Sequence, residues 1–151
     1  MISLCVIARN ASVEFEHMLE TVLPHVDELV VVLGGKSKDN TEEIARKHTD
    51  KIGYFQYTSK PIDDFSGARQ VSLELSSAKG PDDWYFWIDT DDELVNGQHL
   101  RAIAAGCPKE VDMIDMPYLY ARDEYGNVTT LFNRERLIRA SCKPHWIGRV
   151  H

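Results

Sequence analysis

Trp84-Tyr85-Phe86-Trp87-Ile88-Asp89-Thr90-Asp91-Asp92 is the stretch of the chain that decides the fold. Its five consecutive apolar residues predict a strand that is buried on both faces. The strand runs directly into an acidic turn, so carboxylates stand at its C-terminal end. In open α/β sheets, ligands bind outside the carboxyl ends of the strands. The stretch therefore predicts a sheet of this class with an acidic ligand site at its edge.

Three strand–helix units precede this strand. Buried strands are predicted at 2–8, 28–33 and 52–57, and helical spacing of apolar residues follows at 13–23, 40–47 and 65–78. This alternation predicts a parallel sheet with helices on both faces. Because right-handed crossovers place all the C-terminal strand ends at one edge, the loops at Asn10, 34–39 and 89–92 are expected to meet in one crevice.

Helix starts are marked by capping residues. Asn40 with Glu43 three residues later predicts a capping box for the second helix. Asp64 is predicted to cap the third helix.

The segment after Gly97 has a different pattern. A short helix is expected at 98–105, and two strands at 112–121 and 128–133 flank a hairpin turn. We interpret 1–151 as a single domain, with a nucleotide-binding half at 1–97 and an acceptor-side half at 98–151. The extended segment that begins at Trp146 stops at His151, which suggests that the domain is truncated at its C-terminus.

Composition excludes several classes of protein. The chain has 151 residues, with 24 acidic against 17 basic residues and a net charge of −7. Such a charge disfavours non-specific nucleic-acid binding. The three cysteines are widely spaced, which indicates neither a disulfide framework nor a zinc site and favours a reducing cytoplasm. No apolar run approaches the ~20 residues of a transmembrane helix, and a signal peptide is not expected.

The acidic turn is the strongest chemical signal. Asp89 and Asp91, at positions i and i+2, are able to converge with a diphosphate on a hard cation such as Mg²⁺ or Mn²⁺. The alternative is a solvated acidic turn or a helix cap. An Asp-x-Asp pair also follows a strand in haloacid-dehalogenase-type phosphatases, but there it follows the first strand, not the fourth.

The glycine-containing stretch at 34–37 is suited to holding phosphate through backbone amides, although it lacks the spacing of a P-loop.

These stretches together resemble the family 2 glycosyltransferases of the GT-A fold, most of all the bacterial and phage branch similar to lipopolysaccharide-core glycosyltransferases. The matching segments cover nearly the whole chain: 2–10, 26–32, 37–41, 63–70, 84–94 and 146–151. The resemblance implies a Rossmann-like, three-layer α/β/α domain with a mostly parallel central sheet.

The resemblance also implies the site residues. The nucleotide would be bound by Ala8, Arg9, Asn10, Gly35, Asp39, Arg69, Asp89 and Thr90. The metal, Mn²⁺ or Mg²⁺, would be held by Asp91 and His151. For Arg69 the alternative is a solvated helix arginine, and for His151 a surface residue at the chain end. Two positions depart from the family pattern, since Ala11 replaces an acid and Leu33-Gly34-Gly35 replaces an aspartate that grips the nucleoside.

The expected activity is a metal-dependent, inverting transfer of a sugar from a nucleotide-diphosphate sugar, with UDP-sugar favoured, to a hydroxyl of a glycan, lipid-linked or protein acceptor. An inverting enzyme needs a general base beside the acceptor. Asp123 and Glu124 are candidates, and the alternative is that both belong to a solvated hairpin turn. Two other functions stay open: a nucleotidyltransferase on a similar fold, and a non-catalytic nucleotide-binding module.

Overall fold

The computed structural model describes residues 1–56 and 64–148. Its centre is a six-stranded sheet in the order β3-β2-β1-β4-β6-β5. The strands are β1 (Ile2–Ala8), β2 (Glu28–Leu33), β3 (Ile52–Tyr54), β4 (Trp84–Trp87), β5 (Met113–Arg122) and β6 (Val128–Arg139). The first four are mutually parallel, whereas β6 is antiparallel to both β4 and β5. The predicted α/β class with a mostly parallel central sheet is therefore confirmed.

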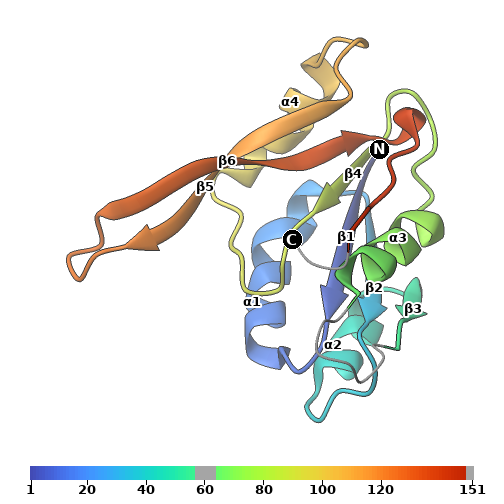
Figure 1. Cartoon of the computed structure of the whole chain (residues 1–151), viewed down its shortest axis with the longest axis vertical. Coiled ribbons are helices and arrows are strands. Elements are labelled where there is room, and N and C mark those ends of the chain that lie inside the picture. The colour runs from blue at the N-terminus through green and yellow to red at the C-terminus, as the bar shows by residue number, and fades with distance from the viewer. Residues whose placement is uncertain (57–63, 149–151) are drawn as a thin grey trace.

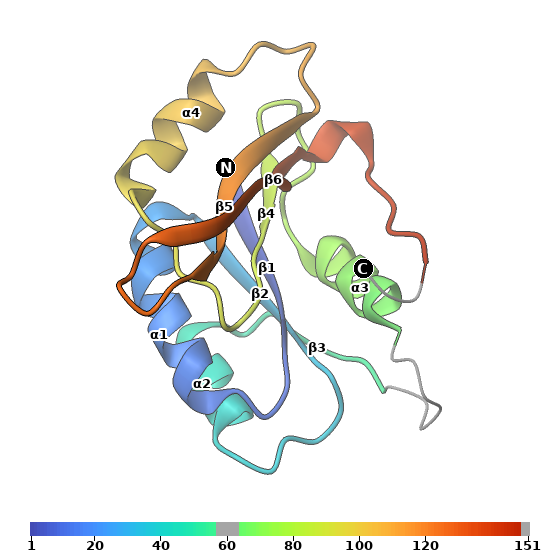
Figure 2. The ribbon, with the colours of Figure 1, turned by 60° about the vertical axis from the view of Figure 1, so that its left-hand side comes forward.

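The helices form a layer on each face of the sheet (Figures 1 and 2). They are α1 (Ser12–Val22), α2 (Thr41–His48), α3 (Phe65–Leu75) and α4 (Leu100–Gly106). Alternate strand residues supply two cores, as a sheet covered on both sides requires. The larger core joins Leu4, Val31 and Phe86 to α1, α2 and α4, and the smaller joins Cys5, Val30 and Tyr85 to α3. This is the expected three-layer arrangement.

Four elements differ clearly from their expected bounds or caps. Helix α3 ends at Leu75, not near Ala78, because Ser76 turns to an extended conformation. Strand β6 continues to Arg139 because its second half pairs with β4. The capping-box prediction was wrong, since the Asn40 side chain makes no cap bond and Asp39 binds the Thr41 amide in its place. Strand β3 ends at Tyr54, earlier than expected, and the predicted last residue, Tyr57, lies outside the described residues.

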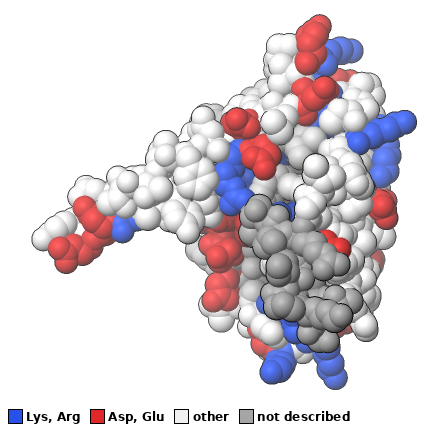
Figure 3. Space-filling model, viewed as in Figure 1, with Lys and Arg blue, Asp and Glu red and all other residues white. Residues whose placement is uncertain are grey.

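The β5–β6 hairpin projects from the body as an arm (Figure 1). Only the segment Leu137–Arg139 pairs with β4, so the distal part has no third strand beside it. Figure 3 shows the arm as a largely uncharged projection with charged side chains at its tip. Within the described residues, no helix has the length and apolar character that a membrane span requires.

Candidate functional site

The loops after β1 and β2 are bonded to each other. The Lys38 amide donates to the side-chain oxygen of Asn10 over 2.7 Å, and the Asn10 amide donates to the Ser37 hydroxyl over 3.2 Å. Asn10 has a φ of 50°, in the left-handed region that asparagine tolerates better than most residues. The expectation that these two loops meet is confirmed.

Asp39 fixes this pair of loops to the helices that follow them. Its carboxylate accepts hydrogen bonds from the Ser12 amide over 3.0 Å, and from the Thr41 amide and hydroxyl over 3.1 and 2.6 Å. The Thr41 hydroxyl and the Ser12 amide hold the pKa of Asp39 down at about 2. A charged Asp39 therefore binds the first amide of both α1 and α2, where a negative charge also suits the helix dipoles.

The loop after β4 is bonded elsewhere, to α3 and to the arm. The Asp89 carboxylate faces the guanidinium of Arg69 at 3.2 Å and that of Arg134, from β6, at 3.9 Å. Within the described residues, Asn10 and Asp39 make no bond to the segment 89–92. The expected single crevice is thus built as two groups along one edge of the sheet, because the third loop is drawn towards the arginines.

Asp92 has the least exposed carboxylate of the acidic turn, with 8% of its side chain exposed. It accepts from Arg136 over 2.8 Å and from the Tyr118 hydroxyl over 2.7 Å, and it also receives the Asp89 amide over 3.2 Å. Burial and the facing carboxylate raise the pKa of Tyr118 to about 12. Burial lowers the pKa of Arg136, although Asp92 opposes this change. Asp92 therefore anchors the base of the arm to the turn.

Asp91 is the exposed carboxylate of the turn, and it has no hydrogen bond or ion pair with any residue that the structure describes. Thr90 beside it is half-buried. The described residues contain no group of three or more histidine, cysteine or acidic side chains placed to hold a metal. Mg²⁺ is commonly bound through one or two carboxylates with water and substrate phosphates completing the shell. The exposed Asp91 carboxylate fits this mode of metal binding. It does not fit a site in which the protein supplies all the metal ligands.

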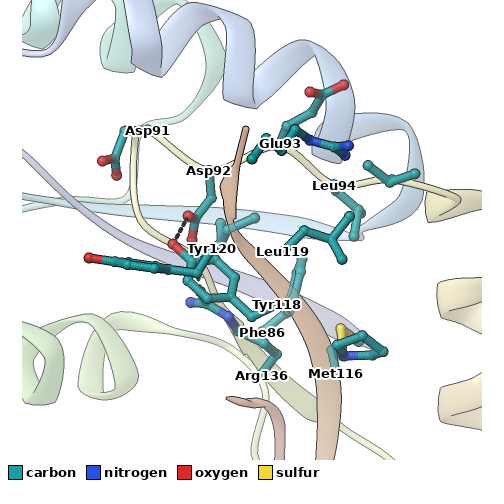
Figure 4. Close-up of a pocket in the computed structure, with 14 residues that line it drawn as sticks. Phe86, Asp91, Asp92, Glu93, Leu94, Met116, Tyr118, Leu119, Tyr120 and Arg136 are labelled. Carbon is teal, nitrogen blue, oxygen red and sulfur yellow. Dashed lines mark hydrogen bonds and ion pairs between the residues drawn. The ribbon is translucent and has the colours of Figure 1, made fainter. Parts of the chain in front are cut away.

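A pocket of about 660 Å³ opens between the acidic turn and the arm (Figure 4). Its wall combines the Asp91 and Glu93 carboxylates with the Tyr118 and Tyr120 rings. The dashed bond in Figure 4 joins Tyr118 to Asp92, whereas Tyr120 is two-thirds exposed. The pocket thus offers aromatic faces and carboxylate oxygens together, a combination suited to a polyhydroxy ligand.

The remaining predicted residues lie as follows. Ala8 is buried at the end of β1, and the next residue, Arg9, is exposed. Gly35 has a φ of 82° and open space where a side chain would stand. Arg69 is buried on α3, so the alternative of a solvated helix arginine was wrong. His151 lies outside the described residues.

Sequence reasoning missed Arg134, Arg136 and Tyr118. The two arginines alternate on β6, and alternation along a strand places side chains on one face. That spacing indicates that the two side chains share one face of a strand, but it does not indicate that this strand lies beside the acidic turn.

Comparison with known proteins shows the fold and the family. The fold is shared with S. aureus TarS, solved with UDP, at 23% identity and a TM-score of 0.51, covering 69% of this chain and 31% of TarS. It is also shared with a 4-diphosphocytidyl-2C-methyl-D-erythritol synthase at 14% identity and a TM-score of 0.58, covering 93% of this chain and 75% of the synthase. At these identities the likeness concerns the fold alone.

The sequence comparisons go further. A TPR repeat-containing protein of Synechococcus elongatus is 34% identical over 94 residues, which are 62% of this chain and 21% of that protein. The chain thus spans about a fifth of that relative's length. The model of the family described as glycosyl transferase family 2 matches residues 3–143, nearly the whole chain. On this match, the chain belongs to glycosyl transferase family 2.

Proposed function

We propose that this chain forms the donor-binding part of an enzyme that transfers a sugar from a nucleotide-diphosphate sugar to an acceptor hydroxyl. The observation that carries the proposal is the exposed Asp91 carboxylate, which stands beyond the carboxyl end of β4 in a family 2 domain. The nucleoside would lie against the loops of Asn10, Gly35 and Asp39, and the diphosphate would point to Asp89 and Asp91. UDP is favoured as the nucleotide, and TarS, which has the same fold, was solved with UDP.

The bound metal would be Mn²⁺ or Mg²⁺, held by Asp91 together with oxygens of the donor diphosphate. His151 remains the proposed second protein ligand. Such a cation stabilises negative charge on a leaving diphosphate.

The proposed transfer is a single displacement with inversion. The acceptor oxygen forms a bond to the anomeric carbon, the bond from that carbon to the β-phosphate oxygen breaks, and its electron pair leaves with the diphosphate. The hydroxyl proton passes to a general base. Asp123 is a poor candidate for this base, because its carboxylate is occupied by the Tyr125 and Asn127 amides and the Asn127 side chain in the turn at the arm's tip. The interpretation of 123–127 as a solvated hairpin turn fits these bonds better.

The acceptor would enter the pocket between the acidic turn and the arm, which borders Asp91. Tyr120 offers an exposed ring there, and sugars pack their apolar faces on such rings. A glycan, a lipid-linked saccharide or a glycosylated protein would each present a suitable terminal sugar.

The test is calorimetric titration with UDP and GDP, each with Mn²⁺ and with a chelator. We expect one nucleotide to bind with micromolar affinity, about −8 kcal/mol, in the presence of Mn²⁺. Asp91→Asn should weaken that binding at least about tenfold, because a metal ligand is lost. It should also lower turnover of the UDP-sugar by about a hundredfold or more.

Asp50→Asn is the matched control, since Asp50 is an exposed aspartate just before β3, at the opposite edge of the sheet. It should leave nucleotide binding unchanged. If neither nucleotide binds wild type under any metal condition, the proposal fails. Transfer of a nucleotidyl group in place of a sugar would identify the nucleotidyltransferase alternative, and binding without transfer or donor hydrolysis would identify a non-catalytic module.

A further inference from the structure

Two arginines from distant parts of the chain flank one carboxylate at the proposed diphosphate position. Arg69 reaches Asp89 from α3 at 3.2 Å, and Arg134 reaches it from β6 at 3.9 Å. The carboxylate contacts the two guanidiniums through different oxygens, so it lies between them. The Asp89 carboxylate therefore helps to position both guanidiniums.

Both guanidiniums keep most of their hydrogen-bonding capacity. A guanidinium has five N–H donors. Within residues 1–56 and 64–148, Arg69 donates one hydrogen bond, and Arg134 donates none, because its contact with Asp89 is too long. The Arg69 side chain is only 9% exposed and that of Arg134 21%. Guanidinium donors that stay accessible on largely buried side chains are suited to an anionic ligand.

Aromatic rings hold the two guanidiniums without using their N–H groups. Arg69 lies over Trp87 at 4.5 Å and over Trp146 at 4.9 Å. Arg134 lies over Trp87 at 5.0 Å and over Tyr118 at 5.2 Å. Ring packing fixes the planes of the guanidiniums, so a ligand that binds them pays little ordering entropy.

Charge around the pair also favours an anion. Three arginines (Arg69, Arg134 and Arg136) meet two paired carboxylates (Asp89 and Asp92), which leaves one positive charge in excess. The negative charge of Asp91 offsets this excess positive charge when no cation is bound. A cation bound to Asp91 would neutralise that carboxylate and restore the excess. The rest of the chain is acidic, with a net charge of −7, so this local excess is not a general property of the protein.

We infer that Arg134 is a phosphate-binding residue that, together with Arg69, binds the diphosphate of the nucleotide donor. This inference rests on the proposed function and adds a second source of positive charge to it. Planar guanidiniums bind phosphate oxygens in pairs of parallel hydrogen bonds. Part of the diphosphate affinity should then persist without a metal.

The experiment compares UDP with UMP by calorimetry, each with Mn²⁺ and with a chelator, on wild type and three variants. Arg134→Gln should weaken UDP binding about tenfold in both conditions, the size expected for a charge-assisted hydrogen bond. UMP binding should change less than about twofold, because UMP lacks the second phosphate that Arg134 is placed to reach. Arg134→Lys keeps the charge and should lie between wild type and Arg134→Gln.

Lys109→Gln is the control, since it removes an exposed positive charge in the loop between α4 and β5. It should leave UDP and UMP binding unchanged. If wild type binds UDP and Arg134→Gln binds it equally well, the role of Arg134 is refuted while the proposed function stands. If Arg134→Gln weakens UMP and UDP equally, Arg134 acts on the nucleoside or on folding, and the inference also fails. If wild type binds no nucleotide, the proposed function fails first.

Discussion

The two ends of the parallel strands carry polar networks of opposite character. At the N-terminal end, the Glu28 carboxylate accepts from the Ser3 hydroxyl over 2.6 Å, from the Ser77 amide over 2.9 Å, and from the Lys51 ammonium. At the C-terminal end, Asp89 lies between two arginines whose donors are mostly unused, and Asp91 has no partner among the described residues. The first network is complete within the protein, whereas the second leaves donors and a carboxylate without partners among the described residues, and we propose that the nucleotide donor binds to them.

This difference separates stability from function. A polar group that is fully bonded within the protein stabilises the fold, whereas an accessible one with unused bonding capacity is available to a ligand. The position of a residue along the sheet does not by itself decide whether it serves stability or binding. Asp92 lies at the C-terminal end of the strands, and its carboxylate is nevertheless bonded to Arg136 and Tyr118. Hydrogen-bond completeness is therefore the property to test.

Asp92→Asn should have the largest effect on stability. It leaves the buried Arg136 guanidinium without a counter-charge, and removal of one partner of a buried ion pair costs about 3 kcal/mol of unfolding free energy. The measurement is urea denaturation at pH 7.

Asp91→Asn is the matched control one residue away, where the same change should alter stability by less than about 0.5 kcal/mol. If Asp91→Asn destabilised the fold as much as Asp92→Asn, the claim that only the fully bonded carboxylate serves stability would be wrong.

Glu28→Gln should come next, with a loss of about 2 kcal/mol at pH 7, because hydrogen bonds to a charged group are lost. The effect should depend on pH. Burial alone would raise the pKa of Glu28, but its bonds to Lys51, Ser3 and Ser77 lower it from 4.5 to about 2. A carboxyl whose pKa is depressed in the folded state adds stability above its unfolded pKa and loses it as pH falls through the folded value.

The difference between wild type and Glu28→Gln should thus be constant above about pH 5 and shrink between pH 4.5 and 2. Urea denaturation at several pH values measures it. Glu43→Gln is the control, since Glu43 makes an exposed pair with Lys47 on α2 at 3.6 Å, worth only a few tenths of a kcal/mol. Nucleotide affinity at pH 7 should be unchanged in both variants.

The parallel half of the fold could be predicted because local patterns determine it. Apolar runs such as Trp84–Trp87 become buried strands wherever helices cover both faces, and Asp64 precedes its helix with the expected cap. Local patterns could not predict that Asp39, and not Asn40, bonds the first amide of α2. Asp39 also binds the Ser12 amide, a contact made across 27 residues of sequence.

The arginines of the site were missed for the same physical reason. Arg134 and Arg136 approach the acidic turn only because β6 lies beside β4, antiparallel and more than 40 residues later in the chain. Residue type and local spacing carry no information on that pairing. The acidic turn was found because Asp89 and Asp91 directly follow their own strand.

Asp64→Ala should have the smallest effect on the free energy of unfolding. It tests whether a helix cap beside the site contributes to stability or to ligand binding. Asp64 accepts from the Gly67 amide over 2.9 Å at the start of α3, the helix that carries Arg69. Loss of an N-cap costs about 1 kcal/mol, and Asp64→Ser, which keeps a cap, should cost only a few tenths. Because the Arg69 guanidinium is held by Trp87 and Asp89 and not by the cap, UDP affinity should stay within about twofold of wild type. A tenfold loss of UDP affinity with only 1 kcal/mol of lost stability would mean that Asp64 acts on the ligand, and that bond completeness does not separate the two kinds of network.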